Sequence, residues 1–511
     1  MKTATNAHGW PPASSSASPR AHSRAHRRWL ILGVICLAQL MVILDATIVN
    51  IALPSAQDEL GFSDANRQWI VTAYALPFGT LLLLGGRLSD LFGRKAAFMT
   101  GLAGFAAASA VGGAAVDFTM LVAARTAQGV FGALLAPAAL ALLTTTFPEG
   151  KERGRAFGVF SAIAGAGGAI GLLLGGLLTE YLSWRWCMYV NLIFAGVAFV
   201  GAAFLLHNRR GKKRPKLDIP GLLSGSAGLF GIVFGLGTAE RYSWTSPLVW
   251  GCLACGMVLL GVFVVLQNLV NHPLLPMRVI LDRNRGGSYL AVLLIGMGML
   301  GVLLLLTFYL QRSLGFSPVR AGVAFLPMVA AIVLAAIIST SVLLPRSGPK
   351  PLVAAGMAVA SCGLYWLSNL QLTSTFAVDV LPPLLVIGFG FGLAMATAIQ
   401  TATMGVASSD AGVASATVNT MQQVGGAVGT VLLNTIAGNA AGNYLAGRTP
   451  TPEILAEAAV RGYTSAFVLG SVIFFGGAVI CGSILRPGAQ SSGTPEMTHD
   501  NVGSVHPTPR D

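Results

Sequence analysis

The sequence predicts an all-α integral membrane protein with fourteen transmembrane helices. Of its 511 residues, 54% are hydrophobic and only 10% are charged, whereas soluble domains carry about 25% charged residues. The mean hydropathy is +0.71. Polar residues are concentrated between apolar stretches that are long enough to cross a bilayer, which takes about 20 residues. This composition excludes a soluble core with a solvated surface.

Each apolar stretch is expected to be a helix, because backbone groups in lipid must find their hydrogen bonds within the segment. In chain order, the expected spans are residues 29–53, 67–86, 95–115, 119–146, 156–180, 186–206, 219–238, 247–268, 287–310, 321–343, 351–370, 378–402, 411–436 and 462–485. The first span, from Trp29, is too long for the apolar core of a signal peptide, so we expect it to remain in the protein. The polar segments 1–28 and 487–511 are expected to be disordered tails.

Basic residues lie mainly on one side of the predicted membrane. Over alternate loops and the tails, 24 Lys and Arg residues fall on the side that holds both termini and seven fall on the other. Cytoplasmic loops carry an excess of Lys and Arg, so both termini are predicted to be cytoplasmic, in a bacterial plasma membrane. The formal net charge of +13 then reflects orientation, and we expect no nucleic-acid partner. The six cysteines lie in or beside apolar stretches without nearby histidines, so we expect no metal and no cofactor.

Two charged residues lie deep within predicted spans, Asp45 in the first and Arg125 in the fourth. A charge at membrane depth costs at least about 2.5–3.5 kcal/mol, so such residues usually face a cavity or a partner. Asp45 precedes Pro54 by nine residues, which places it about 13 Å below the outer end at 1.5 Å per residue. Arg125 lies at a similar depth. The pair is either a protonatable carboxylate beside its counter-ion or a static structural ion pair, and we favour the first.

Glycines repeat every four residues in the fifth span, at Gly167, Gly171 and Gly175, with Gly176 beside them. A helical face without side chains lets another helix approach closely. We therefore expect a glycine packing face here, and ordinary tight packing explains it as well as a sliding surface does.

A short charged turn, residues 86–95, separates the second and third spans. Gly86 and Gly93 permit the turn. Asp90 could accept hydrogen bonds from a helix N-terminus. Taken alone, a basic loop of this kind indicates orientation.

Several of these segments resemble signatures of the major facilitator superfamily, in its fourteen-span drug:proton antiporter branch. The resemblance covers about residues 29–486 and rests on segments 44–54, 69–74, 86–95, 125–129, 183–186, 272–276 and 419–426. The first-helix segment 44–54 and the loop 86–95 are specific to this branch and this superfamily, respectively. The sequence departs from the antiporter signature at Leu172, where that signature has a proline. The kink that a proline imposes on a helix is therefore in question for the fifth span.

The resemblance implies two six-helix halves with inverted repeats, residues 29–206 and 272–486, around a central cavity. Residues 207–271 would join them and supply two additional central helices. The implied function is secondary active transport, not enzymatic catalysis. A small lipophilic organic compound, such as an antibiotic, another drug or a natural product, would be exported in exchange for protons by alternating access. We expect a monomer in the bilayer. A proton-coupled importer of a metabolite, on the same fold, is the alternative.

The resemblance also implies roles for single residues. Asp45 would carry the proton and Arg125 would tune its release. A cytoplasmic latch would be formed by Gly86, Asp90, Gly93, Arg94 and Lys95. The candidates for polar contacts with substrate are Asn50, Tyr74, Gln128, Gln400, Asn419, Gln422 and Gln423, each of which could equally bridge two helices. An ATP-driven pump is disfavoured, because the sequence has no G-x-x-x-x-G-K-[ST] phosphate-binding loop.

Overall fold

The computed structural model describes residues 19–147, 150–206, 218–242, 244–270, 273–275, 277–404 and 411–487. All regular elements in these ranges are helices. In chain order they are α1 (Pro19–Leu60), α2 (Asp64–Phe92), α3 (Arg94–Gly113), α4 (Phe118–Thr146), α5 (Gly150–Tyr181), α6 (Trp186–Leu205), α7 (Ile219–Tyr242), α8 (Pro247–Leu269), α9 (Met277–Ile280), α10 (Arg283–Phe308), α11 (Pro318–Ala324), α12 (Leu326–Ile338), α13 (Leu344–Ser347), α14 (Pro349–Leu367), α15 (Leu381–Thr403), α16 (Ala411–Leu445) and α17 (Pro452–Ile484). Short π-helical segments follow α10, follow α12 and precede α15: η1 (Tyr309–Ser313), η2 (Ser339–Leu343) and η3 (Phe376–Val380).

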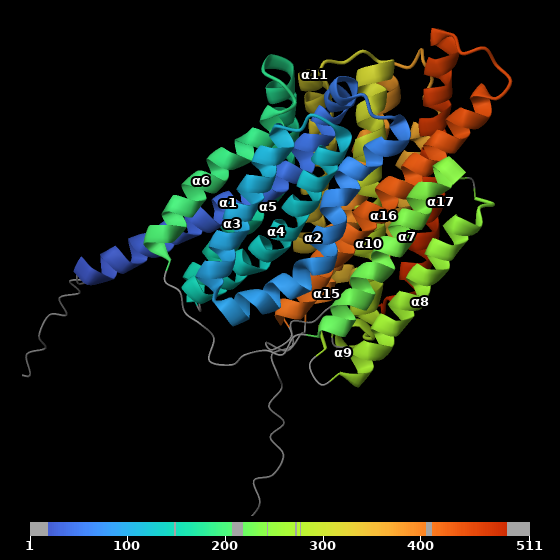
Figure 1. The fold of residues 1–511 in the computed structure, drawn as a ribbon. Coiled ribbons are helices and arrows are strands. Elements are labelled where there is room, and N and C mark those ends of the chain that lie inside the picture. The colour runs from blue at the N-terminus through green and yellow to red at the C-terminus, as the bar shows by residue number, and fades with distance from the viewer. Residues whose placement is uncertain are drawn as a thin grey trace, which may run out of the picture.

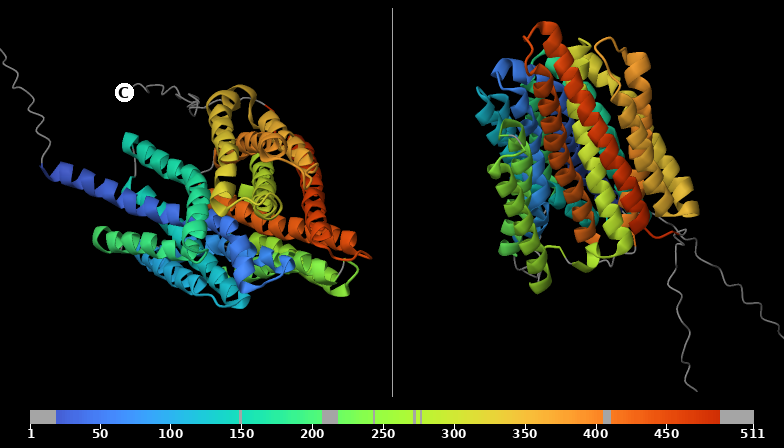
Figure 2. Two further views of the ribbon diagram at one scale, coloured as in Figure 1. Left: turned by 90° about the horizontal axis from the view of Figure 1, so that it is seen from above. Right: turned by 90° about the vertical axis from the view of Figure 1, so that its right-hand side faces the viewer.

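The helices pack side by side in one bundle (Figure 1). Helices α1 to α6 pack together as an N-terminal half, and α10 to α17 pack together as a C-terminal half, as the view from above shows (Figure 2). The two halves meet where α2 packs against α16 and where α5 packs against α11. The hairpin of α7 and α8 covers the first junction, because α7 contacts both α2 and α16 through an apolar cluster that includes Ala75, Val233 and Val431.

Each predicted span overlaps one helix or one run of consecutive helical segments. Within the described residues, twelve helical stretches are long and apolar enough to cross a membrane. Helices α2 and α5 are not among the twelve, and both contain residues whose side chains lie outside the described part. The bundle is thus that of a multi-pass membrane protein.

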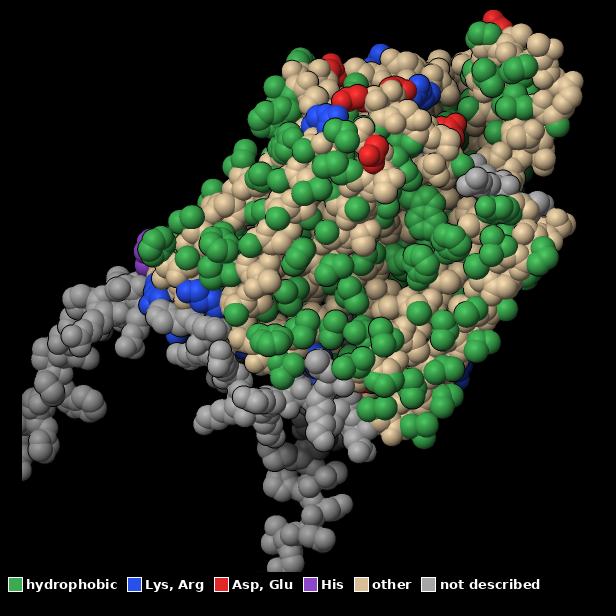
Figure 3. Space-filling view, in the orientation of Figure 1, with side chains coloured by type: hydrophobic (Ala, Val, Ile, Leu, Met, Phe, Trp, Pro, Cys, Tyr) green, Lys and Arg blue, Asp and Glu red, His purple; other side chains and the backbone are tan. Residues whose placement is uncertain are grey.

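The surface of the bundle matches this assignment. In Figure 3, hydrophobic side chains are spread over the middle of the visible face, acidic side chains gather toward the upper end, and Lys and Arg lie at both ends, including the lower end where α1 begins. Helix α17 also ends at the lower end, since Leu485 packs against Gly287 at the start of α10. We refer below to the upper and lower ends of the bundle as Figure 1 orients them.

Helices extend beyond the apolar stretches in two places. Helix α1 begins at Pro19, so residues 19–28 are helical, although the sequence predicts a disordered tail over residues 1–28. At the upper end, α16 continues to Leu445 and α17 begins at Pro452, so both helices extend into residues 437–461, which lie between two predicted spans. Apolar content marks only the part of a helix that faces lipid, whereas Ala, Arg and Glu favour helix in water as well. The predicted tail 487–511 and residues 1–18 lie outside the described residues, apart from position 487.

The two ends of the bundle differ in how the halves share their apolar cores. At the upper end one continuous core joins both halves, with Ile48 and Leu172 from the N-terminal half and Phe308 and Phe325 from the C-terminal half. At the lower end the N-terminal half has a core of its own, and Ala416 is the one described residue of the C-terminal half that packs against it. The halves therefore share an apolar core above, whereas below their apolar cores meet only at Ala416 in the described residues.

Candidate functional site

Asp45 on α1 and Arg125 on α4 form a buried ion pair in the N-terminal half. Arg125 Nη1 lies 2.6 Å from Asp45 Oδ2. Asp45 is 0% exposed and Arg125 is 2% exposed. Two charges can be buried in this way only when each has a partner, because an isolated charge in an apolar interior is strongly unfavourable.

The guanidinium group of Arg125 has further partners on α2 and α4. Its Nε donates to the carbonyl oxygen of Ile70 at 3.1 Å. Its Nη1 also donates to Gln128 Oε1 at 2.8 Å. The guanidinium lies over the face of the Tyr74 ring, with the ring centroid 4.4 Å from Arg125 Cζ, and this contact stabilises the cation further. The side chain is thus fixed from several directions at once.

The second carboxylate oxygen of Asp45 accepts two amide donors. Gln128 Nε2 lies 2.9 Å from Asp45 Oδ1, and Asn191 Nδ2 on α6 lies 2.8 Å from the same atom. Both amides also contact Ser109 Oγ on α3, at 2.7 Å and 3.3 Å respectively. The network therefore draws on α1, α3, α4 and α6. Sequence reasoning missed Asn191 and Ser109, although Asn191 is the only amide side chain in its predicted span.

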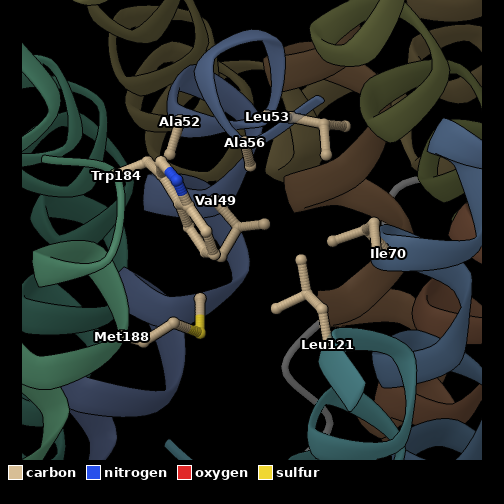
Figure 4. A pocket seen from close by; sticks show the side chains of 8 residues that line it. All are labelled: Val49, Ala52, Leu53, Ala56, Ile70, Leu121, Trp184 and Met188. Carbon is tan, nitrogen blue, oxygen red and sulfur yellow. The ribbon is translucent and has the colours of Figure 1, made fainter. Parts of the chain in front are cut away.

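An apolar pocket lies directly above this network, between α1, α2, α4 and α6 (Figure 4). Its lining residues are Val49, Ala52, Leu53, Ala56, Ile70, Leu121, Trp184 and Met188. Val49 is one helical turn above Asp45, Leu121 is one turn above Arg125, and Met188 is nearly one turn above Asn191. Apolar side chains thus separate the polar network from the upper end of the bundle.

The predicted cavity contacts fall into two groups. Tyr74 and Gln128 touch Arg125, as described above. Asn50 is buried one turn above Asp45 on α1, and its Nδ2 donates to the carbonyl oxygen of Ala46 at 2.9 Å. The remaining candidates, Gln400, Asn419, Gln422 and Gln423, lie on α15 and α16 of the C-terminal half and are half-buried, apart from the exposed Asn419. The structure therefore does not bring these four to Asp45.

In the segment between α2 and α3, Arg94 and Lys95 bind their own half, whereas Arg87 Nη2 donates to the carbonyl oxygen of Pro273 at 3.2 Å. Gly93 has a φ of +96°, a conformation that favours glycine. Arg94 Nη1 donates to the carbonyl oxygen of Ala141 at 3.3 Å. Lys95 Nζ donates to the carbonyl oxygens of Ala203 and Leu206 at 2.7 and 2.8 Å. These contacts tie α3 to the lower ends of α4 and α6.

Gly86 of the predicted latch lies beside α4, whereas Asp90 is described only by its backbone. A Cβ atom at Gly86 would be in ordinary contact with Pro137, at 3.7 Å. The side chain of Asp90 and the segment 405–410, which would face it, lie outside the described residues.

The glycine face of α5 packs against α1. Cβ atoms built at Gly167, Gly171 and Gly175 would meet Ile43, Thr47 and Ile48 of α1, respectively. Gly176 points elsewhere, because a Cβ atom there would lie 2.7 Å from the backbone of Val319 on α11. Helix α5 is continuous from Gly150 to Tyr181, and Leu172, which stands where the signature has proline, is buried.

Polar contacts join the two halves at the upper end. Arg312 of η1 forms an ion pair with Asp58 of α1. The buried Arg67 of α2 donates from Nε to Asn434 Oδ1 of α16 at 2.6 Å. We refer to these two contacts, with the shared apolar core beneath them, as the upper seal.

Further polar contacts lie beside the upper seal. Gln311 Nε2 donates to the carbonyl oxygen of Ile51 at 3.0 Å. The backbone N–H of Val319 donates to Glu180 Oε2 at 2.9 Å. In the described residues no three His, Cys, Asp or Glu side chains are grouped so that they could hold a metal ion.

The chain matches the Major Facilitator Superfamily over residues 35–430. It is 45% identical over 485 residues to the puromycin resistance protein pur8 of Streptomyces alboniger, covering 94% of this chain and 95% of that one. It is 38% identical over 410 residues to the cephamycin export protein CmcT of Amycolatopsis lactamdurans, covering 79% of this chain and 84% of that one. The crystal structure of a bacterial homologue of the human lysosomal transporter Spinster shares the fold, with a TM-score of 0.64 at 16% identity over 90% of this chain and 97% of that one. The chain belongs to the Major Facilitator Superfamily and is a membrane transporter rather than an enzyme.

Proposed function

We propose that the protein is a drug:proton antiporter of the fourteen-span branch that exports an antibiotic or a similar small, largely apolar compound from the bacterial cytoplasm. One observation carries the proposal: Asp45 is a fully buried carboxylate whose charged partner is Arg125, at 2.6 Å. Protonation of such a carboxylate removes its charge and weakens its hold on the arginine, so proton uptake can change the packing of α1 against α4. The names of the relatives, a puromycin resistance protein and a cephamycin export protein, support export as the direction.

The described state supports a transporter that is open toward the cytoplasm. The upper seal closes one end, and the halves have separate cores at the other. The excess of Lys and Arg on the side of both termini supports a cytoplasmic lower end. A substrate would therefore reach the cavity from inside the cell. The structurally similar Spinster homologue was solved in an inward-facing conformation.

Alternating access would require the halves, residues 29–206 and 272–486, to rock against each other, with residues 207–271 supplying α7 and α8 between them. The α5–α11 junction suits such a motion, because Gly176 has no side chain to interlock with Val319. In this state Arg94 and Lys95 bind carbonyl groups of their own half. We infer that Arg94 and Lys95 change partners when the lower ends of the halves approach, whereas Arg87 already donates to the carbonyl oxygen of Pro273 at 3.2 Å.

The proton gradient is sufficient for this task. One proton that moves through about 100 mV and about one pH unit supplies about 2.3 plus 1.4 kcal/mol. This free energy supports a concentration gradient of a few hundred-fold for a neutral compound. A one-to-one exchange would thus lower an intracellular antibiotic concentration enough to protect a cell.

The substrate class can be tested by a resistance and accumulation screen. The gene is expressed in a susceptible bacterial host, and resistance and intracellular drug are measured for several antibiotic classes, including puromycin. We expect resistance together with lower accumulation for at least one lipophilic compound. Unchanged accumulation of all tested compounds, with the protein present in the membrane, would argue against export.

The direction of transport separates export from the alternative of metabolite import. In everted membrane vesicles, the cytoplasmic face is outside. We expect the identified compound to accumulate in the lumen when the lumen is acidified. Accumulation that requires the opposite pH gradient would indicate an importer.

A further inference from the structure

Asn191 on α6 binds the oxygen of Asp45 that Arg125 does not bind. Its Nδ2 lies 2.8 Å from Asp45 Oδ1, whereas Arg125 Nη1 binds Oδ2. Asn191 is 0% exposed. The amide must present its NH2 group to the ionised carboxylate, because two oxygen acceptors in this position would repel each other. Asn191 is therefore a donor to the charged form of Asp45.

The oxygen of this amide makes no hydrogen bond in the described state. Asn191 Oδ1 is buried and has no hydrogen-bond partner among the described residues. Buried acceptors without partners are rare in folded proteins, and each calls for an explanation. A second arrangement of the site, in which this oxygen accepts a hydrogen bond, would explain it.

Protonation of Asp45 creates such an arrangement. A carboxylic acid carries one O–H donor, which needs an acceptor once it is buried. Gln128 Oε1 already accepts from Arg125 Nη1 at 2.8 Å, and Arg125 itself has no acceptor atom. Rotation of the Asn191 amide by half a turn about its last side-chain bond brings Oδ1 to the present position of Nδ2.

We propose that Asn191 is a positioning residue of the proton site, which donates a hydrogen bond to ionised Asp45 and accepts one from protonated Asp45. The proposal rests on the proposed role of Asp45 as the proton carrier. In the step itself one proton from water adds to a carboxylate oxygen of Asp45, and Asn191 exchanges one hydrogen bond for another while all its covalent bonds stay intact. Asn191 thereby stabilises both forms of the carrier, the ionised form more strongly because charge-assisted hydrogen bonds are about twice as strong as neutral ones.

The other charged and titratable groups around Asp45 are the same in the parent protein and in an Asn191 variant. In the described residues, its charged or titratable neighbours are Arg125 on α4, Tyr74 on α2 and Cys187 on α6. Helix α3 contributes Ser109, and α5 meets α1 through its glycine face. A substitution at Asn191 leaves all of these side chains in place.

The test is an infrared pH titration of the purified full-length protein, without added ligand. The carboxylic acid C=O band that is absent from Asp45→Asn reports the protonated carrier. In Asn191→Leu we expect the midpoint of this band to rise by about half to one pH unit, because the variant loses the stronger bond to the ionised form as well as the weaker one. We also expect the band to move to higher wavenumber, because the acid loses its acceptor.

The controls separate this role from a structural one. Asn268→Leu makes the same change on α8, where the side chain bonds to the carbonyl oxygen of Val264 on its own helix, and we expect it to alter neither the midpoint nor the band. Asn191→Ser, which retains a hydroxyl group and adds no bulk, should give an intermediate shift if Asn191→Leu does not fold. An unchanged midpoint and band in the folded Asn191 variants would overturn the proposal. If the parent has no band that Asp45→Asn removes, the proposed proton carrier is wrong, and this inference falls with it.

Discussion

At the scale of single residues, Asp45 and Arg125 depend on each other. Both are buried, and their contact at 2.6 Å is the only ion pair made by either of them in the described residues. Removing one member of a buried ion pair typically costs about 3–5 kcal/mol, because the other charge is left uncompensated. The two members are not equivalent, since a buried carboxyl group can take up a proton whereas arginine stays charged.

This asymmetry predicts the behaviour of three variants. Asp45→Asn should lower the free energy of unfolding by about 3–5 kcal/mol, because Arg125 is left without a counter-ion. Arg125→Gln should cost less at acidic pH, where Asp45 can be protonated. The double variant Asp45→Asn/Arg125→Gln should regain most of the loss, because neither charge remains. Thermal unfolding in detergent measures all three, and a double variant no more stable than Asp45→Asn would contradict the argument.

The sequence predicts part of this site. Asp45 and Arg125 stand out because charge is expensive within an apolar span, and Gln128 follows because it shares a helical face with Arg125. Asn191 and Ser109 are uncharged and lie on helices whose packing against α1 and α4 cannot be read from one sequence. Gln400 and Gln422 lie in the C-terminal half, as the predicted bounds of the halves place them, and their contact with substrate stays a prediction.

At the scale of helices, the packing of α5 against α1 depends on missing side chains. A Cβ atom at Gly175 would lie 2.9 Å from the backbone oxygen of Ile48, which cannot move aside as a side chain can. On the same helix, a Cβ atom at Gly168 would have nothing within 4 Å. The two glycines thus lie on the same helix but differ in the room available for a side chain.

This difference predicts opposite results for two alanine substitutions. Gly175→Ala should destabilise the protein by about 1–3 kcal/mol through overpacking. Gly168→Ala should be neutral or slightly stabilising, because alanine favours the helix by up to about 1 kcal/mol. Melting temperatures of the purified variants provide the measurement. Equal effects of the two substitutions would show that the glycine face does not set the α1–α5 distance.

The hairpin of α7 and α8 is closed at its lower end by a buried polar cluster. Gln267 Nε2 donates to Asp218 Oδ2 at 2.6 Å, and Gln267 Oε1 accepts from the backbone N–H of Leu275 at 2.9 Å. Asp218 and Gln267 are both buried. Gln267 therefore ties α7 and α8 to the segment that leads into the C-terminal half.

Gln267→Leu should destabilise this connection. The change leaves Asp218 Oδ2 and the backbone N–H of Leu275 without these partners, at about 1–3 kcal/mol each, while Asp218 Oδ1 still accepts from the backbone N–H of Gly221. The neighbouring Asn268 is exposed, and its Nδ2 donates to the carbonyl oxygen of Val264 on its own helix. Asn268→Leu, the matched control, should change stability by less than about 0.5 kcal/mol. A melting temperature for Gln267→Leu that equals that of Asn268→Leu would contradict the role assigned to the cluster.

Helices are easier to predict from this sequence than their ends. Every predicted span overlaps a helix, because lipid requires long apolar segments with satisfied backbone groups. The helical residues 19–28 are polar enough to read as a tail, and the upper extensions of α16 and α17 fall in the outer segment 437–461, where the sequence suggests only a short helix from Pro452 to Glu457. Hydropathy marks the membrane and not the helix, so the full length of these extensions could not be predicted from it.

At the scale of the whole molecule, the upper seal should open during transport. Asp58 and Arg312 form an ion pair across the two halves. A disulfide between Asp58→Cys and Arg312→Cys should therefore form under oxidation, stop transport, and release it again on reduction. Each single-cysteine variant serves as the control. Full transport by completely cross-linked protein would show that the halves do not separate at this end.

Proton-coupled export through Asp45 is tested most directly in everted vesicles with a compound identified by the screen. For the parent protein we expect uphill accumulation that requires an acidic lumen, and exchange of labelled for unlabelled compound without any gradient. Asp45→Asn should retain exchange, because the halves can still alternate, but should lose accumulation, because an amide cannot load and release a proton. Accumulation by Asp45→Asn that equals that of the parent, under the same pH gradient, would contradict the account.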